Sequence, residues 1–410
     1  MDIVPFSLDR VNRFLLNKQH LAPGTRGEDV VQVVEDICAL HATAAVTPYL
    51  SLWSRVKGFR RQQLDAELYE KRRLVRILCM RGTLHIVPSA GLPVFFQATR
   101  ERLQRAFLRQ AARLLAQAGL CQDGEEAETL ERLCRRIEKV LMDRGPSTVS
   151  ELSELVPELK IKVKYDVDKP YAGEFSLGSR LVPGMCVLGV LVRAKPRGSW
   201  RSSLYEYAPL VAWLPDMNLE ALTPKEAQVR LVRRYLAAFG PATVEDIAWW
   251  SGLGKRKTRE ALSALGDELV EAKIEGLGGG YLMLAADRQR LQEAQLGMEP
   301  SVNLLPSLDP YIMGYRDRRR FFPSEHYDQV FDRAGNAFAT VWVEGRVVGV
   351  WRELEAAIEL LLWQDVGSEA LTIEAKRLGR FLGGEDVEAV VRPYPPDIHV
   401  KNPFTLAPRR

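Results

Sequence analysis

Arginine recurs at helical spacing in one stretch of the chain. Arg102, Arg105, Arg109 and Arg113 follow one another at intervals of three or four residues, so on an α-helix they share one face. A row of guanidinium groups can bind the phosphates of a nucleic acid, because each group is permanently charged and offers several donors. Few acidic residues follow Glu101 in this stretch. The alternative is a solvated helix face without a ligand.

Other basic segments also suit contact with a phosphate backbone. Residues 195–201 carry three cations and Trp200 between two predicted strands, where a turn would expose them. Residues 255–259 open a predicted helix, and Arg81 precedes a glycine at a strand break. A solvated turn is the alternative for the first segment. The candidate contacts from these segments are Arg81, Arg197, Trp200, Arg201, Lys255, Arg256, Lys257 and Arg259.

The composition is that of a globular protein. The 410-residue chain has 57 Lys and Arg against 53 Asp and Glu, for a net charge of +4, which permits a polyanionic partner without requiring one. Apolar residues make up 46% of the chain and charged residues 27%, which excludes wholesale disorder and fibrous structure. The five cysteines contain no CxxC pair and the five histidines are far apart. No disulfide framework, metal site or other cofactor is therefore predicted.

The sequence shows no targeting or membrane segment. Its first residues lack the apolar core of a signal peptide, and no run of about 18 apolar residues occurs anywhere. We therefore expect a cytoplasmic protein that makes no membrane contact.

A short internal repeat marks two related parts of the chain. Residues 145–152, Gly-Pro-Ser-Thr-Val-Ser-Glu-Leu, match residues 240–247, Gly-Pro-Ala-Thr-Val-Glu-Asp-Ile. In each copy Gly and Pro end one helix. Thr148 and Thr243 then cap the next helix, and Glu151 and Asp246 complete a capping box three residues later.

The elements around the repeats follow the order of a winged helix. After helices at 223–239, from Thr243, and at 255–266, we predict strands at 269–274 and 281–284. The first copy fits the same order, with a helix at 129–142 and strands at 186–193 and 204–211. A more diverged copy has a helix at 28–40, strands at 74–80 and 83–87, and a long helix at 89–118.

The last part of the chain is predicted to be rich in strands. A hairpin signal at 340–351 turns at Glu344-Gly345, and a helix follows at 368–382. We therefore predict an α+β, mainly helical fold, built of tandem winged-helix (helix-turn-helix) domains and a small C-terminal β-rich domain. The predicted domains are 1–125, 126–222, 223–295 and 296–410.

Three stretches of the chain carry a family pattern. The first is Tyr-Leu-Ser-Leu-Trp-Ser-Arg-Val at 49–56, with Met-Arg-Gly-Thr-Leu-His at 80–85. The second runs from Phe-Gly-Pro-Ala-Thr at 239–243 to Trp-Ser-Gly-Leu at 250–253. The third runs from Leu-Pro-Ser-Leu-Asp at 305–309 to Gly-Tyr-Arg-Asp-Arg at 314–318 and closes at 345–352. Together they resemble the tandem winged-helix DNA glycosylases of the AlkZ/YcaQ type.

The resemblance implies a DNA repair enzyme that removes alkylated bases, including interstrand crosslinks at purine N7. Its implied partner is double-stranded DNA, which would place it at the nucleoid. No obligate protein partner is evident, and we expect a monomer. The family pattern adds Arg55, Asp309 and Arg318 to the candidate DNA contacts. For Asp309 and Arg318, a buried Asp–Arg pair that shapes a loop is an equally good explanation.

The family's catalytic Gln-x-Gln or Gln-x-Asp motif lies just ahead of the Tyr-Leu-Ser-Leu-Trp stretch, where this chain has His41-Ala42-Thr43. An N7-alkylated purine is already cationic and leaves without protonation, so the enzyme must mainly position a water and stabilise an oxocarbenium-like sugar. A neutral imidazole and a Thr hydroxyl can both hold such a water. On a continuous helix the two side chains would point about 200° apart. They converge only if the helix ends there.

Two functions are compared from the sequence, and the composition also permits a different substrate such as RNA. The first is a monofunctional DNA glycosylase, hydrolysing the N-glycosidic bond of alkylated nucleotides, in which His41 and Thr43 position the water. The second is a non-enzymatic winged-helix DNA-binding protein, a regulator or damage sensor, in which His41 packs at a helix end. We interpret Glu35 and Asp36 as solvated carboxylates and His85 as a core histidine.

Overall fold

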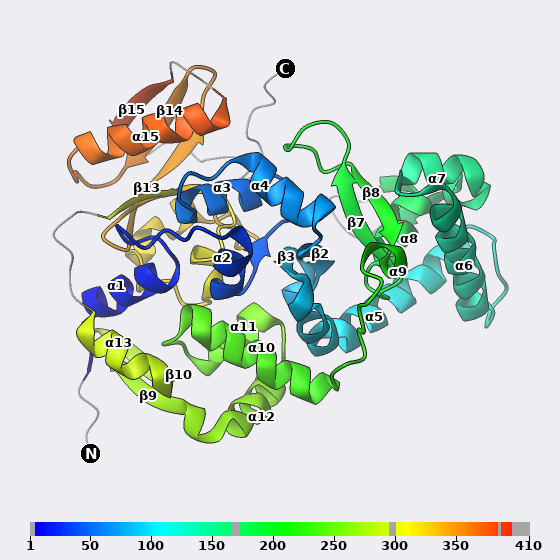
Figure 1. The fold of residues 1–410 in the computed structure, drawn as a ribbon, viewed down its shortest axis with the longest axis horizontal. Coiled ribbons are helices and arrows are strands. Elements are labelled where there is room, and N and C mark those ends of the chain that lie inside the picture. The colour runs from blue at the N-terminus through cyan, green and yellow to red at the C-terminus, as the bar shows by residue number, and fades with distance from the viewer. Residues whose placement is uncertain (1–4, 166–172, 295–300, 384–386, 396–410) are drawn as a thin grey trace. The chain divides into compact units, whose positions relative to one another are not determined.

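The computed structural model describes residues 5–165, 173–294, 301–383 and 387–395. The chain folds into two compact units, one made of residues 1–63 and 229–410 and the other of residues 64–228. Figure 1 traces both units from the blue N-terminus to the red C-terminus. The predicted mixed, mainly helical architecture is confirmed.

The unit of residues 64–228 is organised around long helices and short antiparallel hairpins. Strands β2 (Leu74–Leu78) and β3 (Leu84–Pro88) pair with each other and lead into the helices α5 (Leu92–Gln117) and α6 (Glu126–Arg144). Helix α5 buries Leu103, Phe107, Ala111 and Leu114 on one face. Its length and position match the predicted long helix closely.

The first repeat lies in the same unit. Strand β4 (Ser147–Thr148) precedes helix α7 (Val149–Leu155), and the hairpin of β5 (Lys162–Tyr165) and β6 (Gly173–Ser176) precedes helix α8 (Gly178–Met185). Strands β7 (Leu191–Pro196) and β8 (Tyr205–Pro209) then pair, followed by helix α9 (Leu210–Trp213). The strand predicted at 186–193 was wrong over its first half, because a turn that follows α8 and includes Gly189, where φ is 77°, occupies that stretch.

The second repeat belongs to the other unit. Helices α10 (Pro224–Phe239), α11 (Val244–Ser251) and α12 (Lys255–Leu265) precede strands β9 (Leu269–Ile274) and β10 (Leu277–Leu284), which form an antiparallel pair. This confirms the predicted order of helix, helix, helix, strand and strand. Helix α13 (Arg288–Glu293) then packs against α1 (Leu8–Lys18).

Both repeats contain the predicted capping boxes. The Thr148 hydroxyl accepts from the Glu151 backbone N–H, and the Glu151 carboxylate accepts from the Thr148 N–H. Thr243 and Asp246 make the same reciprocal bonds. Asp246 has a second role, because its Oδ1 also accepts from the backbone N–H groups of Arg316 and Asp317. One buried carboxylate therefore joins the start of α11 to the loop that follows residue 314.

The C-terminal part is a five-stranded sheet in the order β11-β12-β13-β14-β15. Its strands are β11 (Val302–Leu305), β12 (Thr340–Val343), β13 (Arg346–Glu353), β14 (Ala357–Leu362) and β15 (Glu388–Pro393). Neighbours are antiparallel except β14 and β15, whose parallel pairing requires a crossover. Helix α15 (Glu369–Leu382) makes that crossover and packs on β14 and β15 (Figure 1). The β-rich closing region is thus confirmed.

Candidate active site

The segment around His41 is a short strand and a loop between two helices. Helix α2 (Val30–Asp36) ends four residues earlier than predicted, because Cys38 adopts a left-handed backbone with φ of 70°. Strand β1 (Leu40–His41) follows, and residues 42–46 lead into helix α3 (Thr47–Arg55), which has Pro48 in its first turn. The helix therefore ends before His41, as convergence of His41 and Thr43 requires.

His41 and Thr43 are joined by one hydrogen bond. The Thr43 backbone N–H donates to His41 Nδ1 at 3.4 Å. Because Nδ1 accepts this bond, a neutral His41 carries its proton on Nε2. The His41 side chain is buried, with 4% of the residue exposed, whereas Thr43 is exposed. The pair thus combines an oriented, buried imidazole with a solvent-accessible hydroxyl.

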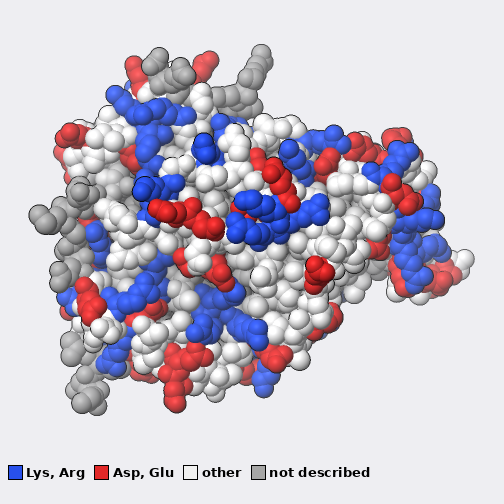
Figure 2. Space-filling view, viewed as in Figure 1, with Lys and Arg blue, Asp and Glu red and all other residues white. Residues whose placement is uncertain are grey.

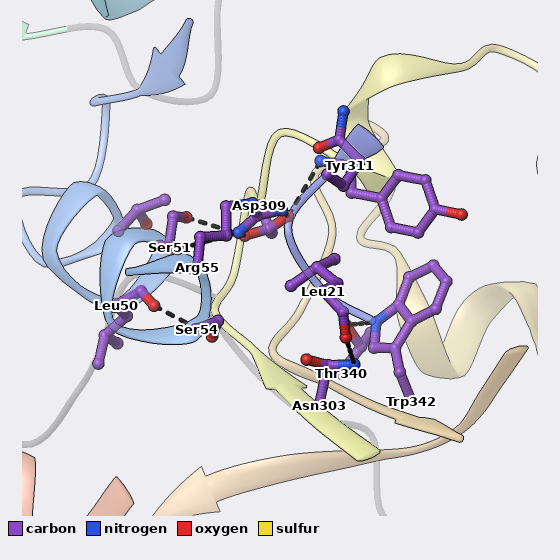
Figure 3. A network of polar contacts seen from close by, with 12 residues as sticks. Leu21, Leu50, Ser51, Ser54, Arg55, Asn303, Asp309, Tyr311, Thr340 and Trp342 are labelled. Carbon is purple, nitrogen blue, oxygen red and sulfur yellow. Dashed lines mark hydrogen bonds and ion pairs between the residues drawn. The ribbon is translucent and has the colours of Figure 1, made fainter. Parts of the chain in front are cut away.

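Helix α3 is held in place by polar bonds to the loop after β11. The Thr47 hydroxyl donates to the Ser307 carbonyl at 2.8 Å, and the Ser51 hydroxyl donates to Asp309 Oδ2 at 2.8 Å. One helical turn later, Arg55 binds both oxygens of Asp309, at 2.8 and 2.7 Å. Figure 3 shows Ser51 and Arg55 reaching from the helix toward Asp309. This network fixes the helix that begins directly after the His41–Thr43 loop.

Arg55 and Asp309 are structural residues, which corrects their expected role in binding DNA. Both side chains are fully buried, and each satisfies the charge of the other. Asp309 also accepts from the Tyr311 backbone N–H at 2.9 Å, which shapes the loop. The alternative of a buried Asp–Arg pair was therefore right for Asp309, but its partner is Arg55 and not Arg318. Sequence reasoning missed Ser51, Thr47 and Ser307, whose role depends on contacts more than 250 residues away.

Arg318 is also buried, so its expected role in binding DNA is a second correction. Only 7% of the residue is exposed, and the guanidinium lies 4.8 Å from the ring centroid of Trp249 and 4.2 Å from that of Phe331. Its Nη1 donates to the Tyr327 hydroxyl at 3.3 Å. Burial lowers the pKa of Arg318. The aromatic faces hold the cation inside the fold.

The arginine row on α5 remains available to a ligand. Arg102, Arg105, Arg109 and Arg113 are all exposed on the face opposite the buried apolar residues. Arg105 pairs with Glu101 at 2.9 Å. Within the described part of the chain, the other three take part in no ion pair. Figure 2 shows Lys and Arg in separate groups on the visible face, with Asp and Glu between many of them.

The basic segment between β7 and β8 is more neutral than its sequence indicates. Arg197 bridges two carboxylates, with Nη2 at 3.0 Å from Glu151 and Nε at 2.6 Å from Glu206. Trp200 and Arg201 are half-buried, and the Arg201 guanidinium lies 5.0 Å from the Trp200 ring centroid. An arginine that already has two acidic partners has less to gain from a phosphate.

The basic start of α12 is also partly paired. Lys255 pairs with Glu245 at 2.7 Å, and Arg256 pairs with Glu260 at 2.5 Å. Lys257 is half-buried, whereas Arg259 is exposed and enters no ion pair between described residues. In the other unit, Arg81 is half-buried with a left-handed backbone, φ 55°. Of these side chains, Arg259 is the freest to bind phosphate.

Three other titratable side chains, Glu35, Asp36 and His85, serve the fold. Glu35 pairs with Arg234 at 3.1 Å and Asp36 with His20 at 2.8 Å, so neither carboxylate is simply solvated as expected. In the other unit, burial lowers the pKa of His85 to about 4, which keeps this core histidine neutral at pH 7. No three metal-binding side chains of the described residues lie close enough to hold an ion. No described helix is both long and apolar enough to cross a membrane.

The sequence matches the family model "DNA glycosylase AlkZ-like" over residues 34–381. The chain belongs to the AlkZ-like DNA glycosylase family. It is 26% identical over 366 residues to the "Interstrand DNA cross-link repair glycosylase" of Streptomyces sahachiroi, covering 88% of this chain and 91% of that protein. The solved structure of Streptomyces sahachiroi DNA glycosylase AlkZ aligns with a TM-score of 0.72 at 21% identity, covering 95% of this chain and all of that one.

The match confirms the resemblance drawn from the three sequence stretches. The matched residues include the whole segment from β1 to α3 and the loop after β11, and with them the His41–Thr43 loop and its anchor at Asp309. In this AlkZ-like chain, the His41–Thr43 loop lies inside the matched range and directly precedes the anchored helix α3.

Proposed function

We propose that this AlkZ-like chain is a monofunctional DNA glycosylase that hydrolyses the N-glycosidic bond of alkylated nucleotides in duplex DNA. N7-alkylated purines and crosslinked nucleotides are its proposed substrates. Support comes from the family and from the name of the Streptomyces sahachiroi relative, which is an interstrand crosslink repair glycosylase. Monofunctional chemistry is proposed because no lysine occurs from residue 19 to residue 56, so no amine beside the motif can form a Schiff base.

His41 and Thr43 are the proposed residues that position the attacking water, Thr43 through its hydroxyl and His41 by orienting the loop. The exposed Thr43 hydroxyl can both donate to and accept from a water molecule. His41 accepts from the Thr43 N–H through Nδ1, so it orients the loop and does not itself take the proton through that atom. A cationic N7-alkylated base leaves readily, which reduces the need for a strong general acid or base. Positioning of water by neutral groups can therefore suffice.

The observation that carries this proposal is the hydrogen bond between Thr43 and His41. Their loop leads directly into α3, which three of its own side chains anchor to the loop after β11. A catalytic pair must keep its geometry to within a fraction of an ångström. Buried bonds from Thr47, Ser51 and Arg55 supply that rigidity from the helix side. The exposed arginines of α5 are proposed to contact the DNA backbone, and Arg259 is proposed separately as a contact of the other unit.

Excision from a defined duplex tests the proposal. A duplex with one N7-methylguanine is incubated with the full chain, and alkali then cleaves any abasic site. Thr43→Ala should lower the excision rate by about tenfold to a hundredfold, in the range expected for one positioning group. Thr372→Ala, on α15, is the matched control and should leave the rate unchanged. Strand cleavage before alkali, or full activity in Thr43→Ala, would contradict the proposed mechanism.

A non-enzymatic DNA-binding protein is the second candidate function. The observation in its favour is the burial of His41, with 4% of the residue exposed, together with the absence of the family's glutamines at this place. The same duplex separates the two functions. Binding of the duplex without any excision of N7-methylguanine or of a crosslinked base would support this second function.

A further inference from the structure

A pocket of about 500 Å³ lies within the unit of residues 1–63 and 229–410. Its lining comes from three places in the chain, namely residues 21–24 with Arg26 and Glu28, Lys57, and residues 301–303. None of these residues belongs to the proposed catalytic loop. The pocket therefore needs its own explanation.

A short backbone bridge brings two cations to the rim of this pocket. Gly27 pairs in parallel with Val56, through bonds from Gly27 N–H to the Arg55 carbonyl and from Lys57 N–H to the Gly27 carbonyl, both 2.9 Å. Arg26 and Lys57 thus lie on two neighbouring backbone segments at the pocket. The carboxylate of Glu28 is 4.0 Å from Lys57 Nζ, and both side chains are largely exposed.

The inner wall of the pocket is polar and fixed. Asn303 and Ser301 are each 2% exposed. The Asn303 amide nitrogen donates to the Leu21 carbonyl at 3.0 Å and to Ser301 Oγ at 3.1 Å, and the Ser301 hydroxyl donates to the same carbonyl at 3.2 Å. These bonds use the donors of both side chains within the protein, so this wall is rigid and the donors for a ligand must come from elsewhere in the lining.

Arg26 is poorly neutralised by the protein. Its acidic neighbour, Glu374, is bound by Arg377 through two hydrogen bonds of 2.8 and 2.6 Å, whereas Arg26 reaches Glu374 only once, at 3.4 Å. Burial lowers the pKa of Arg26, the nearby charge of Arg377 lowers it further, and Glu374 offsets this only in part. One carboxylate thus serves two guanidinium groups, which leaves an excess of positive charge beside the pocket.

We propose that this pocket binds a phosphate group through Arg26 and Lys57, the two cations among its lining residues. A guanidinium and an ammonium at one rim are well suited to phosphate oxygens. The phosphate can come from a DNA backbone, which rests on the proposed function, or from a free nucleotide, which does not. The volume of the pocket leaves room for more than the phosphate alone.

Line broadening of inorganic phosphate in ³¹P NMR tests the site in the full chain at constant ionic strength. Wild type should broaden the signal, and Arg26→Gln and Lys57→Gln should each weaken binding by about tenfold, as expected when one charge-assisted hydrogen bond is removed. Glu28→Gln removes the opposing charge and should tighten binding by about twofold to threefold. Arg346→Gln is the matched control, because it removes an exposed cation of the same unit that pairs with Asp9 outside the pocket.

Competition then distinguishes the two sources of phosphate. Displacement by an undamaged duplex supports a backbone phosphate, and displacement by a deoxynucleoside monophosphate but not by the duplex supports a free nucleotide. Equal broadening in wild type, Arg26→Gln and Lys57→Gln, or no broadening at all, overturns the proposal. None of these measurements uses base excision, so failure of the site and failure of the proposed glycosylase activity are separable.

Discussion

Arg55 and Asp309 form a bidentate ion pair in which neither side chain reaches solvent. The pair joins the end of α3 to the loop after β11, and Ser51 donates to the same carboxylate. A buried carboxylate that accepts from a guanidinium, a hydroxyl and a backbone N–H has its charge fully matched. Loss of either partner leaves the other charged and unpaired.

Removal of one partner of this pair should therefore be costly. Asp309→Ala should lower the free energy of unfolding by about 3–5 kcal/mol, the cost of leaving a buried charge unpaired. Ser51→Ala removes one hydroxyl donor only and should cost about 1–2 kcal/mol. Urea denaturation followed by far-ultraviolet circular dichroism measures both. Equal losses in the two variants would show that the guanidinium is not the dominant partner.

The buried Asp246 caps helix α11 and also binds the loop after residue 314. Its removal should therefore destabilise the protein more than removal of an ordinary helix cap. Asp246→Ala removes the capping-box bonds at Thr243 and two bonds to the backbone at residues 316 and 317. We expect Asp246→Ala to lower the free energy of unfolding by about 3 kcal/mol or more. Thr148→Ala, which removes a single helix cap, should lower it by about 1 kcal/mol. Thermal unfolding of the two variants provides the comparison. A smaller shift for Asp246→Ala would mean that the second pair of bonds contributes little.

The local features of the fold were predictable, and the long-range ones were not. The capping boxes and the strand at 269–274 agree with the sequence because they depend on neighbouring residues and on periodicity. The predicted end of α2 was wrong because the residue with the left-handed backbone there is Cys38 and not a glycine. Glycine is the usual signal for that conformation.

At the candidate site, too, the local features were predictable and the long-range contacts were not. The family pattern pointed to His41 and Thr43 as candidates, and the hydrogen bond between them lies within one loop. Arg55, Asp309 and Arg318 were expected at the DNA because they lie in the stretches that carry the family pattern. Their burial depends on partners that sequence spacing does not reveal, such as the Arg55–Asp309 contact across 254 positions and the rings of Trp249 and Phe331 around Arg318.

His85 should make the stability of the protein depend on pH below neutrality. Burial lowers its pKa from 6.5 to about 4, so between these values the unfolded chain binds a proton that the folded chain does not. The stabilising contribution is present above pH 6.5 and is lost as the pH falls toward 4. As the pH falls from 7 to 4.5, protonation of this group in the unfolded chain should lower the free energy of unfolding by about 2–3 kcal/mol. Urea unfolding of wild type and of His85→Gln at the two pH values measures this contribution. The free energy of unfolding should fall less with pH in the variant, because it lacks the histidine.

Exposed arginines of α5 should determine how strongly DNA binding depends on salt. Arg102→Gln combined with Arg109→Gln removes two exposed guanidinium groups that enter no ion pair between described residues. The slope of log K against log salt concentration should become less steep by roughly one for each phosphate that the double variant no longer binds. Arg197→Gln is the matched control, because its guanidinium already pairs with Glu151 and Glu206, and it should change the slope little. Fluorescence anisotropy with a labelled duplex between about 50 and 200 mM salt measures these slopes. An unchanged slope in the double variant, with a reduced slope in Arg197→Gln, would move the DNA-binding surface from α5 to the segment between β7 and β8.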